Sequence, residues 1–203
     1  VTREELAASF TIDRVVPNPA MFDIERLNFL NGHFIREMDE SRWHATIADW
    51  CERQLDAAVP RPIAADFVAE VAPLLRKRVA RLDQIAPMVG FLFGTDAPEY
   101  VPALLAERVG GDPSVARQVV DAALVALDAI PAAEWSQALV EAAVRGLEQP
   151  LSMKLRKFVS VLYVAEMGVP QGIPLFDSMV LLGRERALHR LRAARARLEH
   201  SRA

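Results

Sequence analysis

The sequence has 203 residues, a formal net charge of −3 and a hydrophobic fraction of 52%. This length allows one large domain or two small ones, each with a core that needs no disulfide. The single cysteine, Cys51, excludes an internal disulfide framework and indicates a reducing compartment. No apolar run reaches the roughly 18 residues that a membrane helix needs. We therefore expect a cytoplasmic protein with no membrane segment, and the start at Val1 rather than Met indicates a fragment.

The basic residues are concentrated in two places, although the total charge is negative. Four of them fall within six residues: Arg76, Lys77, Arg78 and Arg81. Six arginines between positions 184 and 197 crowd the last predicted helix. A net charge of −3 is not typical of a protein that binds nucleic acid, but local basic patches can still meet phosphate.

Apolar residues recur at three- and four-residue steps along nearly the whole chain, and this pattern predicts helices throughout. Asp23 is expected to cap a helix that places Ile24, Leu27, Leu30 and Phe34 on one face. The next helix opens at position 40 or 41 and is broken by the prolines at 60 and 62. The further predicted helices span residues 64–80, 84–93, 98–108, 113–130, 132–147, 152–167, 175–182 and 184–199, after a short one over 4–10.

Prolines and glycines divide this helical pattern. Pro73 is expected to kink or divide the helix over residues 64–80. The run from Gly110 to Pro113 stops one helix and starts another. Gly94 and Pro98 mark a loop near the middle of the chain. We therefore predict an all-α fold of two consecutive helical-bundle subdomains, residues 1–95 and 96–203.

The sequence contains no constellation that indicates a catalytic centre. It has no glycine-rich phosphate loop, no Cys/His set with metal spacing and no plausible pair of nucleophile and base. The four histidines are scattered, and Cys51 is expected to be an inert thiol. Trp43 and Trp50 lie seven residues apart, which favours two core anchors on one helix face. We therefore predict no catalytic, metal or cofactor-binding residues in this chain.

Four segments carry a family resemblance, and they occur in the family's order. They are FDIERLNFLNGHFIR (22–36), LRKRVARLDQIAPMVGFLF (75–93), VRGL (144–147) and LFDSMVLLGRERALHRL (175–191). Together they resemble the C-terminal anticodon-binding half of bacterial glutamyl-tRNA synthetases, which are class I aminoacyl-tRNA synthetases. The resemblance spans almost the whole chain, and the last segment is the most specific.

The resemblance implies a fold, a partner and a missing half. In that family two helical subdomains of the helix-cage type bind the anticodon of tRNA(Glu). ATP and Mg²⁺ would be bound by a catalytic domain in cis, upstream of Val1, so this fragment itself would need no cofactor. Proteins read single-stranded RNA loops by stacking on the bases and bonding to their edges, which requires aromatic faces and guanidinium groups. No oligomer is implied.

Five positions carry the family's tRNA-binding residues over to this chain. Arg26 stands at a Lys position, Phe29 stands at a Trp position, and Asn31 is kept. Arg78 matches an Arg that faces the third anticodon base and distinguishes glutamate tRNA from glutamine tRNA, whereas Gln there would indicate a relaxed enzyme. Arg145 matches another tRNA-contacting Arg. The alternatives are that Phe29 is a core residue and that both arginines are ordinary solvated charges.

The second subdomain departs from the family pattern. Where the family has an Arg and a Thr, this chain has Tyr163 and Met167. A Tyr can stack on a base or make one hydrogen bond, but it lacks the positive charge and the two parallel N–H donors of a guanidinium group. The following turn, 168–175, keeps its proline and glycine residues, so Gly172 and Leu175 are expected to shape the same pocket.

The leading hypothesis is a tRNA-anticodon-binding part of a glutamate–tRNA ligase. One alternative is a diverged module of the same fold that binds a protein partner, which the acidic balance and Tyr163 favour. Another is a purely structural bundle, which does not account for the ordered motifs. The leading hypothesis requires Phe29, Arg78, Arg145 and Tyr163 to share one concave face.

Overall fold

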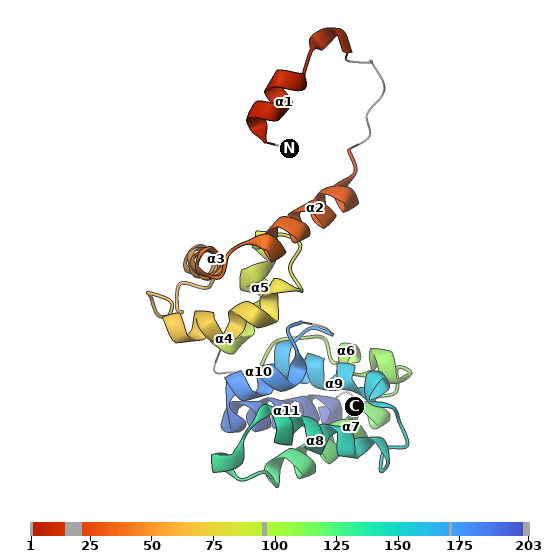
Figure 1. Ribbon diagram of the computed structural model, residues 1–203. Helices are drawn as coiled ribbons and strands as arrows, with labels where there is room; N and C mark the ends of the chain where they lie inside the picture. Colours follow the sequence, from red (N-terminus) through yellow and green to blue (C-terminus); the bar gives the residue numbers. More distant parts are fainter. Residues whose placement is uncertain (1, 15–21, 95–96, 171, 201–203) are drawn as a thin grey trace.

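The computed structural model describes residues 2–14, 22–94, 97–170 and 172–200, and all regular secondary structure in these ranges is helical. This confirms the predicted all-α fold class. The chain begins with α1 (Arg3–Ser9), and Figure 1 shows the later helices in two groups. The first group contains α2 (Ile24–Glu37), α3 (Glu40–Gln54), α4 (Ala65–Arg76) and α5 (Ile85–Val89). The second contains α6 (Ala103–Ala106), α7 (Pro113–Asp128), α8 (Gln137–Arg145), α9 (Leu155–Met167), α10 (Leu175–Leu182) and α11 (Arg184–His200).

Aspartates begin three of the longer helices. The Oδ1 atoms of Asp23 and Asp39 accept the N–H groups of the third helical residues of α2 and α3, at 2.9 and 2.8 Å. Asp112 caps α7, whose first residue is Pro113. Each carboxylate satisfies a backbone donor that has no partner inside the helix. The predicted Asp23 cap is therefore confirmed.

The helix predicted over 64–80 is shorter than expected. Pro73 lies inside α4 without dividing it, and the helix ends at Arg76. The backbone N–H groups of Arg78 and Val79 both donate to the Leu75 carbonyl, at 2.8 and 3.1 Å, so the last turn tightens and the chain leaves the helix. The basic residues from Lys77 onward consequently lie beyond the helix end.

Three other predicted helices are broken into shorter pieces. Residues 82–92 form α5 flanked by the 3-10 helices η2 (Leu82–Gln84) and η3 (Gly90–Leu92), and residues 98–108 keep only the single turn of α6 and part of a 3-10 turn. The segment 132–147 begins its α-helix at Gln137 because Trp135 is extended. Its indole Nε1 donates to the Met179 carbonyl at 3.1 Å. A tertiary hydrogen bond thus overrides the local helical pattern.

The described residues form two hydrophobic cores. One is built around Trp43, Ile47 and Leu75 from the first group of helices, and Trp43 donates its indole N–H to the Ala72 carbonyl at 3.0 Å. The other core is formed by α6 to α11. Two residues from the second half of the sequence, Ile173 and Leu182, belong to the first core. The groups therefore share packed surface, while the exact division at residue 95 stays a prediction.

Two arginines of α11 hold these groups together. Arg190 is buried, and its Nη1 donates to the Glu166 carbonyl at 2.5 Å while its Nη2 donates to the carbonyls of Phe91 and Gly94, at 2.7 and 2.9 Å. Arg186 donates through Nη1 to the Leu92 carbonyl at 2.8 Å. The carbonyls of Phe91, Leu92 and Gly94 lie at the end of the first group. Through them, α11 fixes the position of η3 and the chain that follows it.

The remaining arginines of α11 are also engaged by the protein. Arg184 and Arg192 pair with Asp128, and Arg195 pairs with Asp121 and Glu199. Arg197 donates to the Pro98 carbonyl and lies over the Tyr100 ring. Arg186 and Arg190 are therefore occupied by carbonyls of the fold, whereas Arg192 and Arg195 are exposed, so that a basic patch on the last helix stays a prediction for these two. None of the described helices has the length and apolar character needed to cross a membrane.

Replacing Arg190 with Ala is expected to destabilise the fold by roughly 3 kcal/mol, because it removes the donor to the carbonyls of Glu166, Phe91 and Gly94 and leaves a cavity in place of a buried side chain. Denaturation with urea measures the change. Arg192→Ala is the matched control, since it removes an exposed ion pair and should cost less than about 1 kcal/mol. Equal effects of the two substitutions would contradict the role assigned to Arg190.

A buried carboxyl makes stability depend on pH. Glu166 is fully buried, and neither carboxyl oxygen has a hydrogen-bond partner among the described residues. Burial raises the pKa of Glu166 well above the ordinary range, against the opposing charge of Arg190. The folded state therefore holds this proton to higher pH than the unfolded state does, so stability falls as pH rises from about 4.5 toward the folded-state pKa.

Glu166→Gln removes this titration and should flatten the decline in unfolding free energy between pH 5 and pH 8. Urea midpoints at both pH values measure it, with exposed Glu107→Gln as the control. Parallel pH profiles for the wild type and Glu166→Gln would contradict the assignment.

Candidate nucleic-acid interface

Four of the predicted site residues meet where the two groups of helices adjoin. We call Arg78, Tyr163, Gly172 and Leu175 the junction site. Arg78 is exposed, and its Nε donates to the Gly172 carbonyl at 3.1 Å. Neither Nη group of Arg78 makes a hydrogen bond or ion pair with the described residues. One bond therefore holds the guanidinium in place while the two Nη groups remain available to a ligand.

Tyr163 has a structural contact in the junction site. The half-buried Tyr163 hydroxyl accepts the backbone N–H of Leu175, the first residue of α10, at 3.2 Å. Pro174 precedes α10 and provides no side-chain cap, so the tyrosine satisfies a helix-terminal donor from outside the helix. The Leu175 side chain is buried, which leaves it no surface for a ligand. Tyr163 thus fixes the turn that carries Gly172.

The solvent-exposed surface of α2 has two distinct faces. Arg26, Phe29, His33 and Arg36 follow one another at three- and four-residue steps, so they share the face that we call the α2 polar face. Phe29 is 69% exposed, which excludes the alternative that it is a core residue. A cation, an aromatic ring and an imidazole on one helical face provide both charge and stacking surface for RNA.

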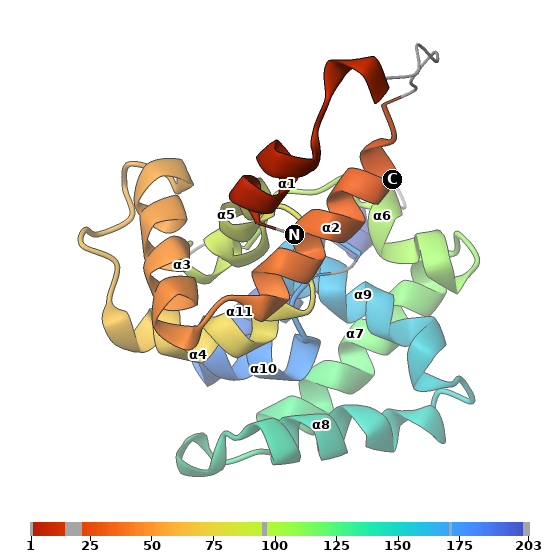
Figure 2. The same ribbon diagram turned by 45° about the horizontal axis from the view of Figure 1, so that its top comes forward.

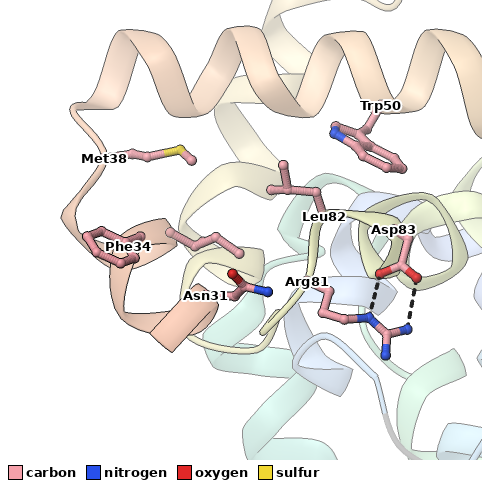
Figure 3. Close-up of a pocket in the computed structure, with 8 residues that line it drawn as sticks. Asn31, Phe34, Met38, Trp50, Arg81, Leu82 and Asp83 are labelled. Atoms are coloured by element: carbon pink, nitrogen blue, oxygen red, sulfur yellow. Dashed lines mark hydrogen bonds and ion pairs between the residues drawn. The ribbon is translucent and has the colours of Figure 1, made fainter. Parts of the chain in front are cut away.

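Asn31 lies on the other face. Residues Ile24, Leu27, Asn31, Phe34 and Met38 form a second series at helical spacing, which we call the α2 stripe. Figure 3 shows Asn31, Phe34 and Met38 at a groove with a volume of about 420 Å³, across from Trp50 of α3 and the Arg81–Asp83 ion pair. The structure therefore separates Asn31 from Arg26 and Phe29, although the three positions are close in sequence.

Arg145 lies elsewhere. It ends α8, and its Nε donates to Glu141 Oε1 one turn earlier at 2.6 Å. Figures 1 and 2 both show α8 on the opposite side of the molecule from α2. No described contact joins Arg145 to the junction site. The sequence-predicted residues are thus distributed over several places, and one face that all of them share stays a prediction.

Sequence reasoning missed a cluster of basic residues at the start of α9. Lys154, Arg156 and Lys157, the α9 basic cluster, are exposed, and their side chains make no hydrogen bond or ion pair with the described residues. The first turn of α9 contains no acidic residue. Cations at a helix N-terminus oppose the macrodipole, by about 0.3–1 kcal/mol each, so helix stability does not explain them. Three basic residues in four positions at a helix start was the available signal.

Neither a metal cluster nor an exposed thiol is found among the described residues. No group of three or more His, Cys, Asp or Glu side chains within them is placed to hold a metal ion. Cys51 is buried, and burial raises the pKa of its thiol to about 11, so it stays protonated at neutral pH.

Comparison with known proteins places the chain in a family. The family model described as an anticodon binding domain matches residues 36–195. The chain therefore belongs to the anticodon-binding domain family. The glutamate–tRNA ligase of Salinispora arenicola is 36% identical over 196 residues, which cover 93% of this chain and 40% of that protein. The same-named protein of Roseiflexus sp. RS-1 is 32% identical over 199 residues, 98% of this chain and 38% of that protein.

A solved structure has the same fold. A glutamate tRNA ligase from Elizabethkingia meningosepticum, in complex with its amino acid, superposes with a TM-score of 0.68 at 15% identity, covering 97% of this chain and 37% of that one. The chain spans about two fifths of the length of the curated relatives it matches. The predicted resemblance to the anticodon-binding half of these ligases is confirmed.

Proposed function

We propose that this chain binds tRNA(Glu) and reads its anticodon as part of a glutamate–tRNA ligase. The observation that carries the proposal is Arg78, whose Nε is anchored on Gly172 while its two Nη groups face outward without a partner in the described structure. A pre-positioned guanidinium fork can donate two parallel hydrogen bonds to a base edge at low entropic cost. The exposed location beside a rigid turn suits an unpaired loop, whose bases are accessible.

The difference in ion pairing among the basic residues also supports this proposal. The exposed arginines of α11 pair with carboxylates, whereas the exposed cations of the α9 basic cluster and the α2 polar face make no ion pair with the described residues. Phosphate can bind these free cations even though the chain as a whole is anionic. In the proposed ligase this chain contributes binding, orientation and discrimination. Glutamate activation with ATP and Mg²⁺ would take place in the cytoplasm on a catalytic domain in cis.

Replacing the α9 basic cluster, as Lys154→Ala/Arg156→Ala/Lys157→Ala, should weaken tRNA binding and lower its dependence on salt. If each cation neutralises one phosphate, the slope of log K against log salt should decrease by roughly 2–3. Fluorescence anisotropy with labelled tRNA at several salt concentrations measures it. Arg192→Ala/Arg195→Ala is the control, because both arginines already pair with carboxylates. An unchanged slope in the cluster variant would remove the cluster from the interface.

Arg78→Gln should relax the preference for a glutamate anticodon over a glutamine anticodon by about 1–3 kcal/mol, as expected for a lost bidentate contact to a base. The ratio of the two tRNA dissociation constants measures this preference. Arg81→Gln is the matched control within the same basic run, since Arg81 is paired with Asp83 at 2.8 Å. If both variants keep the wild-type ratio, Arg78 does not read the anticodon.

A further inference from the structure

A short turn before α10 connects the two groups of helices. Ile173 in this turn is buried in the first core, whereas Leu175, two positions later, is buried in the second. The carbonyl of Gly172, one residue before Ile173, accepts the hydrogen bond from Arg78 Nε at 3.1 Å. Residues 172–175, which we call the bridging turn, therefore contact both groups. The direction of the Gly172 carbonyl decides where the guanidinium group of Arg78 is held.

Two side chains of α9 contact the bridging turn. At its end, the Tyr163 hydroxyl accepts the backbone N–H of Leu175 at 3.2 Å. At its start, a β-carbon added to Gly172 would lie 3.0 Å from the sulfur of Met167, so the Met167 side chain packs directly against the backbone of Gly172. Met167 is itself buried, which limits its freedom to move away. Helix α9 thus holds the bridging turn at both ends.

The Tyr163 contact restrains the turn in a way that apolar burial does not. Burial of the Ile173 side chain is non-directional and tolerates some rotation of the backbone. A hydrogen bond, in contrast, weakens steeply when the angle at its hydrogen becomes small, so it restrains that rotation. Pro174 gives α10 no side-chain cap, and the Tyr163 hydroxyl supplies the acceptor for the first N–H of the helix. Tyr163 therefore restrains the orientation of the peptide groups in the bridging turn.

Arg78 is attached to each group of helices by one hydrogen bond. Its backbone N–H donates to the Leu75 carbonyl of the first group at 2.8 Å, and its Nε donates to Gly172 of the bridging turn. The Nε bond is the one hydrogen bond that its exposed side chain makes with the described residues. An arginine side chain without such a bond samples many rotamers, and ordering them on binding weakens a contact. A correctly directed Gly172 carbonyl removes that cost in advance.

We infer that Tyr163 is a positioning residue for anticodon discrimination, whose hydroxyl acts through the bridging turn and Arg78 rather than on the RNA. This inference rests on the proposed function, in which Arg78 bonds to the edge of an anticodon base. The Tyr163 bond to Leu175 holds the bridging turn so that the two Nη groups point at one base edge. Without the hydroxyl, the guanidinium keeps its charge but loses its fixed orientation, so a wrong base is rejected less strongly.

A double-mutant cycle in the product of the complete natural gene tests this inference. The wild type, Tyr163→Phe, Arg78→Gln and the double variant are each titrated with a transcript of tRNA(Glu). They are also titrated with the same transcript in which only the third anticodon base is changed to that of a glutamine anticodon. The ratio of the two dissociation constants measures discrimination. Phe removes the hydroxyl and keeps the ring, so any stacking of position 163 on RNA is retained.

Tyr163→Phe should lower the discrimination ratio roughly two- to tenfold while Arg78 is present, as expected for one lost hydrogen bond. In the Arg78→Gln background it should leave the ratio unchanged, because the residue through which it acts is gone. Trp135→Phe is the matched control. Trp135 also makes a side-chain hydrogen bond to α10, to the Met179 carbonyl at 3.1 Å, but away from the bridging turn, so this variant should keep the wild-type ratio.

The inference is overturned if Tyr163→Phe lowers the ratio equally in both backgrounds, because the hydroxyl then acts on the RNA directly. It is also overturned if Tyr163→Phe leaves the ratio unchanged, or if Trp135→Phe lowers it to the same extent, because Tyr163 then only supports the fold. In each of these cases the proposed function stands as long as Arg78→Gln lowers the ratio. If Arg78→Gln does not lower it, the role of Arg78 as anticodon reader fails together with the inference.

Discussion

The arrangement of this molecule depends on arginine side chains that bind backbone carbonyls across the boundary between two helical groups. Arg190 is buried and joins α9 to the end of η3, and Arg186 reaches the neighbouring carbonyl of Leu92. A buried charge is tolerable only when its hydrogen bonds are satisfied, so this geometry is demanding. When the hydrogen bonds of Arg190 are made, they hold the two groups of helices together. Arg78, which follows α4, then lies within hydrogen-bond distance of Gly172, which precedes α10.

The same chemistry explains how an anionic chain can present a surface for a polyanion. The arginines fall into two groups that composition cannot distinguish. Those of α11 donate hydrogen bonds to carbonyls or pair with carboxylates, whereas Arg78 and the α9 basic cluster are exposed and make no ion pair with the described residues. Attraction to phosphate depends on the second group and on how closely its members gather, rather than on the total charge.

Helix α2 exposes two chemically different surfaces. Its periodicity separates an apolar stripe from a face with cations and an aromatic ring, and the 69% exposure of Phe29 shows that this ring is not needed for packing. The stripe residues 24, 27, 31 and 34 precede the residues matched by the anticodon-binding family model, whereas Met38 and the junction site lie inside them.

The sequence by itself determined the helical class, the Asp23 cap, the helix over 175–182 and the family, because each follows from local periodicity, capping chemistry or ordered motifs. Tertiary structure decided what local patterns could not encode. Trp135 leaves helical geometry to reach Met179, and Tyr163 bonds to the start of α10. Likewise, Arg184, Arg186 and Arg190 donate to carbonyls distant in sequence, because only the packed chain brings those acceptors within their reach.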